Sequence, residues 1–169
     1  MASLKHPRVL AFTSIFCALS IVLSLLSVPF LLGLRVHFFQ VAIFLCSSLA
    51  GPFPGLVCGS IAGFYTAIVR ADPTILVGNG LLGLASGLLG RKFRPFVACM
   101  IAWFLVQAPW ILFTGTFILG VPVQVMQTIL VLLTVEDLIS AALTDIVVVR
   151  LGFRSWFNER IIRAKRPSL

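Results

Sequence analysis

Long apolar segments separated by short polar turns constrain the fold of this chain more than any other feature. The 169 residues have a mean hydropathy of +1.12, and only 11% of them are charged, whereas an ordinary soluble domain has about 25%. A soluble protein of this size cannot hide so much apolar surface, because small proteins have a large surface relative to their volume. We therefore expect a lipid bilayer to be the solvent for most of the chain.

Six apolar segments are candidates for membrane-spanning helices. They are residues 8–28, 37–50, 55–69, 75–89, 95–119 and 122–149. A bilayer core about 30 Å thick needs about 20 helical residues, and the second, third and fourth segments are shorter than this, so the second and third can alternatively form one re-entrant hairpin. We expect an all-α membrane protein: a compact bundle of six transmembrane helices in residues 1–150, followed by a basic cytoplasmic tail at 151–169.

The distribution of the basic residues predicts the orientation of the bundle. The net charge is +8, but the basic residues cluster at the ends of apolar segments, which is typical of membrane orientation and not of nucleic-acid binding. With six crossings, one face carries Lys5, Arg8, Arg91, Lys92, Arg94, Arg150, Arg154, Arg160, Arg163, Lys165 and Arg166. Only Arg35 and Arg70 fall on the other. The positive-inside rule then places both termini in the cytoplasm, whereas five spans would divide the basic clusters between the faces.

Several chemistries have no sequence support. The four cysteines lie within apolar segments, and no two of them have Cys-x-x-Cys spacing, which disfavours a disulfide framework or a zinc site. His6 and His37 fall on opposite faces, so they do not form a metal site. Phosphate-binding loops and nucleophile-elbow motifs are absent from the sequence. We expect no cofactor, no metal and no enzymatic activity.

Glycines predict close packing of two neighbouring segments. Gly55, Gly59 and Gly63 repeat every four residues on one side of the third segment, and Gly83 and Gly87 do the same on the fourth. Small residues let helix backbones approach closely, and such packing drives helix association in lipid. We expect these two helices to be buried in the bundle.

A polar turn between the third and fourth segments predicts an outward-facing ligand site. Arg70 and Asp72 lie in this turn, and Asn79 lies about one helical turn into the fourth segment. Gln40 and Tyr65 are expected to complete the pocket. The alternative is an exposed turn in which the Asp caps the helix and the Arg extends to the membrane surface.

The fifth segment carries a polar and aromatic face. Trp103, Gln107, Trp110 and Thr114 are spaced four, three and four residues apart, so they stack on one side of a helix. Two indoles around an amide are suited to a planar molecule that forms hydrogen bonds. The alternative is a set of interfacial aromatic residues with one interhelical amide bond.

The sixth segment carries acidic residues near mid-depth. Charges there are costly, so Glu136 and Asp137 must face the bundle or a wet cavity, or they must bind a proton. On a helical wheel, Asp137 borders a stripe that contains Gln127 and Asp145, while Glu136 lies opposite. We therefore expect Asp137 and Gln127 to face the ligand and Glu136 to pair with another helix or a partner. In the alternative interpretation, both acids are purely structural.

Three stretches carry a resemblance to a known family. They are residues 12–24 on the first segment, 44–63 around the Gly-Pro-rich turn, and 72–83 at the outward turn. Together they resemble the substrate-binding S component of energy-coupling factor (ECF) transporters. Members usually carry Ala-x-x-x-Ala on the first span, and Ser14-x-x-x-Ala18 is the matching motif here.

The resemblance implies a transport function in the cytoplasmic membrane of a prokaryote. The chain would capture a vitamin-like or other small planar polar molecule from outside. Ser14 and Ala18 would dock a transmembrane T component, and two separate ATPase subunits would hydrolyse ATP. Two other functions stay open: a structural or assembly membrane protein without a ligand, and an intramembrane enzyme that uses Asp137 and Glu136.

Overall fold

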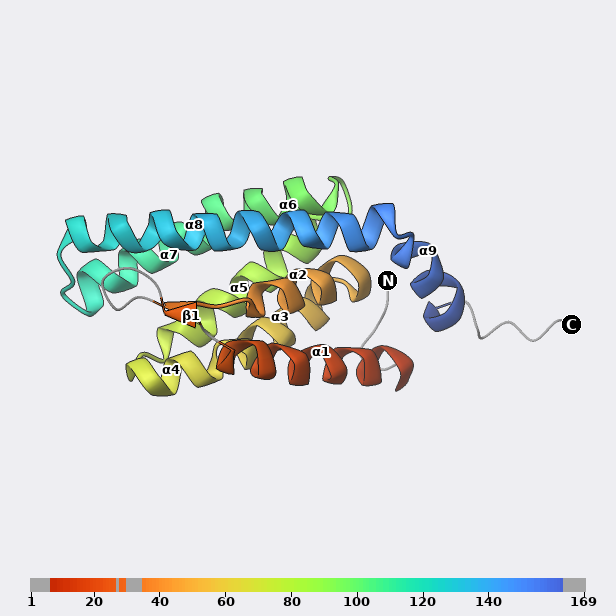
Figure 1. Ribbon diagram of the computed structural model, residues 1–169, viewed down its shortest axis with the longest axis horizontal. Helices are drawn as coiled ribbons and strands as arrows, with labels where there is room; N and C mark the ends of the chain where they lie inside the picture. Colours follow the sequence, from red (N-terminus) through yellow and green to blue (C-terminus); the bar gives the residue numbers. More distant parts are fainter. Residues whose placement is uncertain (1–6, 27, 30–34, 163–169) are drawn as a thin grey trace, which may run out of the picture.

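Helices account for nearly all of the computed structural model, which describes residues 7–26, 28–29 and 35–162 (Figure 1). The α-helices are α1 (Pro7–Leu25), α2 (Phe39–Ala50), α3 (Pro52–Ala62), α4 (Phe64–Arg70), α5 (Thr74–Leu89), α6 (Pro95–Ala102), α7 (Ala108–Phe113), α8 (Val123–Asp145) and α9 (Phe153–Phe157). Wider π-helical turns occupy Trp103–Gln107, Thr114–Ile118, Ile146–Arg150 and Asn158–Ile162. Two strands of two residues each, β1 (Val28–Pro29) and β2 (Arg35–Val36), pair antiparallel.

Apart from α9 and the π-helical turn after it, the described helices join into six rods, whose ends lie within three residues of the expected segments. Helices α3 and α4 form one rod, α6 continues through a π-helical turn into α7, and α8 runs to Arg150. Three rods of the described chain are long and apolar enough to cross a membrane: Pro7–Leu25, Pro52–Arg70 and Pro95–Ile118. Helices α2 and α5 are apolar but shorter, so the expectation of six crossings stays a prediction.

Helix α2 lies at the centre of the bundle. It packs against α1, α3, α5 and α8, and all of its residues except Val41 are buried. Figure 1 shows it between α8 on one side and α1 on the other. Its twelve residues span about 18 Å, which is well short of a hydrocarbon core of about 30 Å. The helix therefore begins inside the bundle, not at its edge.

Helices α3 and α5 pack backbone against backbone, as the glycine repeats predicted. A Cβ atom added to Gly83 would collide with the carbonyl of Gly55, and one added to Gly59 would collide with the carbonyl of Asn79. Contacts this close exclude every side chain larger than hydrogen. The pairing fixes the position of α5, which carries Asn79 toward the outward turn.

Part of the expected tail packs onto the bundle. Phe157 on α9 is fully buried and joins a cluster with Val9 and Phe12 of α1. Arg8 also donates a hydrogen bond to the Arg160 carbonyl at 3.0 Å. The start of α1 and the end of the described chain therefore lie at one end of the molecule, and residues 163–169 fall outside the described part.

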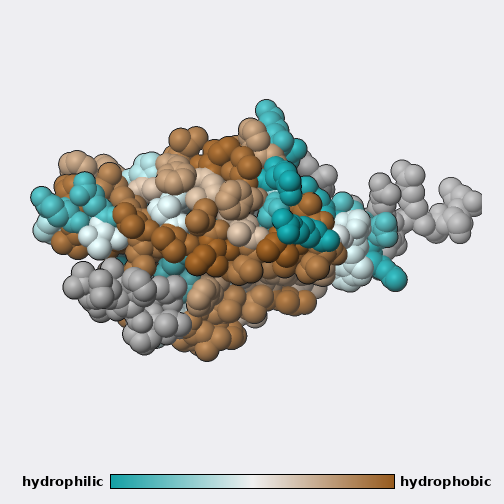
Figure 2. Space-filling view, turned by 45° about the horizontal axis from the view of Figure 1, so that its top comes forward, coloured by the Kyte–Doolittle hydropathy of each residue, from teal (hydrophilic) through white to brown (hydrophobic). Residues whose placement is uncertain are grey.

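Large apolar side chains cover the outside of the rods. Figure 2 shows a broad apolar surface with hydrophilic residues gathered toward the ends of the molecule. The exposed side chains include Leu105, Phe117 and Val131, each more than 60% accessible. Water-facing surfaces rarely carry contiguous apolar patches of this kind, and this surface is that of a multi-pass membrane protein.

We predict that Gly83→Ala destabilises the bundle by about 1–3 kcal/mol, because the new methyl group must push α3 and α5 apart. The matched control is Gly90→Ala, at a helix end with φ −62°, where an added Cβ would lie 3.1 Å from the Ser86 carbonyl oxygen. This control should change stability by less than about 1 kcal/mol. Thermal unfolding in detergent measures both variants, and equal unfolding temperatures would contradict the close packing.

Candidate functional site

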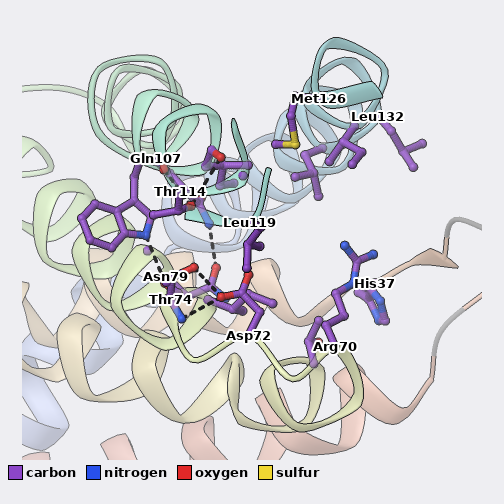
Figure 3. Close-up of a pocket in the computed structure, with 18 of the residues that line it drawn as sticks. His37, Arg70, Asp72, Thr74, Asn79, Gln107, Thr114, Leu119, Met126 and Leu132 are labelled. Atoms are coloured by element: carbon purple, nitrogen blue, oxygen red, sulfur yellow. Dashed lines mark hydrogen bonds between the residues drawn. The ribbon is translucent and has the colours of Figure 1, made fainter. Parts of the chain in front are cut away.

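A cavity of ≈ 270 Å³ opens beside the turn between α4 and α5 (Figure 3). Its walls come from the start of α2, from α4, α5 and α7, and from the first half of α8. The polar lining side chains are His37, Gln40, Thr66, Arg70, Asp72, Thr74, Asn79, Gln107, Trp110, Thr114 and Glu136. Apolar residues from α7, α8 and the connection between them complete the walls. A few polar groups in a mostly apolar cavity are typical of small-molecule sites.

The structure brings six of the ten expected ligand-binding residues to this cavity. They are Gln40, Arg70, Asp72, Asn79, Gln107 and Trp110. The other four, Tyr65, Trp103, Gln127 and Asp137, lie outside its lining. On α1, Ser14 and Ala18, which the resemblance implied would dock a T component, are exposed on the outer surface.

Two amide side chains meet across the cavity wall. Gln107 donates a hydrogen bond from Nε2 to Oδ1 of Asn79 at 2.7 Å, as Figure 3 shows. Gln107 lies on the π-helical turn Trp103–Gln107, immediately before α7. Pro109 follows and has no N–H to donate to the preceding turn, so a wider turn forms here. Both amides are buried, and the Gln107 Oε1 atom has no hydrogen-bond partner within the described residues.

Trp110 forms part of the cavity wall beside α5. Its Nε1 donates to the Thr74 carbonyl at 3.0 Å, and its ring packs where a side chain on Gly78 would otherwise lie. Trp103 was expected on the same face, but its Nε1 donates to Thr134 at 3.0 Å inside the bundle. The π-helical turn shifts Trp103 around the helix relative to Trp110, because it holds more residues per turn than an α-helix.

The outward turn combines a helix-capping group with a rim charge. Asp72 accepts hydrogen bonds from the backbone N and the hydroxyl of Thr74, at 3.0 Å and 2.6 Å. This is the capping role that was the alternative to ligand contact, although Asp72 also lines the cavity. Arg70 is exposed at the end of α4, and Figure 3 shows it beside His37 at the cavity rim.

Glu136 lines the cavity, whereas Asp137, which was expected to face it, does not. The Glu136 carboxylate accepts from the backbone N of His37 and from Nε2 of Gln40, each at 3.2 Å. The His37 N–H lies just before α2, and Gln40 lies in the first turn of this helix, where backbone N–H groups have no partner within the helix. A carboxylate there is favoured by the helix dipole. The structure thus bears out the pairing of Glu136 with another helix.

The cavity-facing side of α8 explains why Asp137 does not line the cavity. Met126, Ile129, Leu133 and Glu136 line it from this helix, so this side is mainly apolar. The expected stripe rested on the polar residue Gln127, which is exposed. The buried polar side chains of α8 lie farther along the helix, at Glu136, Asp137, Ser140 and Thr144.

The three acids of α8 are not brought into one site. Asp137 is fully buried outside the cavity lining, and its carboxyl oxygens have no hydrogen-bond partner within the described residues. Asp145 pairs with Arg94 at 3.1 Å at the other end of the helix. Among the described residues, no group of three or more His, Cys, Asp or Glu side chains could hold a metal ion, and His6 falls outside that part.

Comparison with known families corrects the resemblance drawn from the sequence. A family model described as 5TMR of 5TMR-LYT matches residues 2–149. It represents a five-transmembrane family and not a family of ECF S components, so the ECF assignment was wrong. Neither the curated proteins nor the solved structures gave a match.

We predict that Glu136→Ala lowers the stability of the protein by about 2 kcal/mol, because the donors of His37 and Gln40 lose a charged acceptor in a buried site. Glu136→Gln keeps an acceptor oxygen and should lose less. The matched control is Gln127→Ala, an exposed change on the same helix, with an effect within about 0.5 kcal/mol. Wild-type unfolding temperature for Glu136→Ala would show that α2 does not need this carboxylate.

Proposed function

The chain belongs to the 5TMR of 5TMR-LYT family, and we propose that it is a membrane-embedded binding domain for a small, planar, polar molecule that donates hydrogen bonds. The cavity beside α5 is the proposed site. As expected from the sequence, we propose that the ligand enters the cavity from the outer side of the membrane. The T component and the ATPase subunits rested on the corrected resemblance and are not carried forward.

Two unpaired oxygen atoms support this proposal most strongly. The side-chain oxygens of Gln40 and Gln107 are buried in the lining of one cavity, and neither has a hydrogen-bond partner within the described residues. A buried acceptor without a partner costs about 1–3 kcal/mol. A ligand with N–H or O–H groups removes that cost at both positions, and the Glu136 carboxylate adds a third acceptor nearby.

The remaining walls favour a flat and compact ligand. The Trp110 indole is held by its bond to Thr74 and by its packing on Gly78, so it offers a fixed aromatic surface. Met126 and Leu133 contribute apolar walls from α8. The volume of ≈ 270 Å³ is close to the lower end of the range for ligand pockets. A vitamin-like heterocycle with ring N–H groups or a primary amide has the required chemistry.

The orientation is part of the proposal. We place the protein in the cytoplasmic membrane of a prokaryote, with both termini inside and the cavity open to the outside. The contact between Arg8 and the Arg160 carbonyl supports an even number of passages, because it joins the two ends of the described chain. The uneven distribution of basic residues supports the direction.

A structural or assembly role is the second candidate function. The backbone contacts of Gly55 with Gly83 make a tight helix pair without any ligand, and such a pair is sufficient for a scaffold. The two functions differ in one observable property, since only a binding domain retains a small molecule stoichiometrically.

We predict that native mass spectrometry of the gently extracted protein finds a small molecule at about one per chain. Gln107→Leu and Gln40→Leu each remove one unpaired acceptor and should lower its occupancy at least about tenfold. Gln127→Leu is the matched control, because Gln127 is exposed and outside the cavity. A bound molecule that survives both cavity substitutions would move the site elsewhere, and the lack of any bound molecule would favour the scaffold.

A further inference from the structure

A second cleft lies at the opposite end of the molecule, near the end of the described chain. It has a volume of ≈ 350 Å³. It is formed where α2 and α5 end, where α3 begins, and where α9 crosses beside them. The polar lining side chains are Ser47, Ser48, Arg91, Arg154 and Asn158.

Two arginines give this cleft its charge. Arg91 lies in the turn after α5, and Arg154 on α9 donates to the Gly90 carbonyl at 3.0 Å. A guanidinium has five N–H donors, so Arg154 keeps donors beyond the one that it uses. The nearest acids by chain position do not line the cleft: Asp145 pairs with Arg94, and Glu159 is exposed.

Ser48 supplies an independent sign of a ligand. Its side chain is 8% exposed, it lines the cleft, and its hydroxyl oxygen has no hydrogen-bond partner within the described residues. The Cys99 thiol lies beside it, but a thiol is a weak hydrogen-bond partner. A buried hydroxyl normally has a partner, and this one borders an electropositive cleft.

The start of α3 adds a further donor. Gly51 precedes this helix with φ 105°, and the space around its Cα is open. Because Pro52 and Pro54 carry no N–H, the first turn of the helix presents the Phe53 N–H without a partner in the helix. Helix N-termini of this kind favour anions. The carbonyls at the end of α5 oppose this effect, and Arg154 already satisfies that of Gly90.

We propose that this cleft binds a phosphate group through Arg91, Arg154, Ser48 and the first turn of α3. The phosphate belongs to an anionic lipid headgroup or to a soluble phosphate compound, since both present the same oxygen atoms to the arginines. The site shares no residue with the cavity beside Trp110, so this proposal does not depend on the function proposed for that cavity.

Thermal unfolding of the detergent-solubilised full chain tests the site with two probes. One is inorganic phosphate, compared with chloride at equal ionic strength. The other is dioleoylphosphatidylglycerol, compared with dioleoylphosphatidylcholine. Saturable stabilisation by phosphate identifies a soluble ligand, and stabilisation by the anionic lipid alone identifies a headgroup. If neither probe stabilises the wild-type protein more than its comparator, the proposal is overturned.

Substitutions locate the effect within the cleft. Arg91→Gln should lower the affinity for the stabilising probe about tenfold, and Ser48→Ala should lower it severalfold. Lys92→Gln is the matched control, because Lys92 is the exposed neighbour of Arg91 and does not line the cleft. Equal weakening by Arg91→Gln and Lys92→Gln would show that only general surface charge is involved, and it would overturn the assignment.

Discussion

The contact between Glu136 and the start of α2 is the interaction on which the outer half of the molecule depends. A helix of about 18 Å inside a bundle that must cross about 30 Å exposes its first N–H groups at depth. Irregular backbone is tolerated there only where protein or a cavity surrounds it. The carboxylate accepts from the His37 N–H just before this helix and from the Gln40 side chain in its first turn, and these residues line the cavity. The buried acid and the cavity thus both lie at the start of the short helix.

Backbone contacts between α3 and α5 determine the shape of that cavity. Gly59 lets α3 reach the backbone of Asn79, and Gly78 leaves room for the Trp110 ring. The side-chain oxygen of Asn79 in turn accepts a hydrogen bond from the NH₂ group of Gln107, and the Gln107 side-chain oxygen has no partner within the described residues. The glycines that pack the bundle therefore also orient the polar groups of the candidate site.

Sequence patterns predicted the helices well because long apolar runs end at glycine, proline and basic residues. They placed Asn79, Gln107 and Trp110 together because helical spacing holds across most of this region. Trp103 was misplaced because a π-helical turn interrupts that spacing. Asp137 was misplaced because the expected stripe was drawn through Gln127, which is exposed. The ECF resemblance was wrong because small residues and Gly-Pro turns recur wherever short helices pack closely.

Labelling of single cysteines introduced at two neighbouring positions tests most directly whether water reaches the bundle interior beside Glu136. Leu132 lines the cavity, while its neighbour Val131 is 67% exposed on the outer surface, and the four native cysteines are buried. A membrane-impermeant methanethiosulfonate reagent added outside should label Leu132→Cys but not Val131→Cys, because thiolates form only in contact with water. An unreactive Leu132→Cys, beside a Thr74→Cys control that does react at the outward turn, would contradict the cavity at the start of α2.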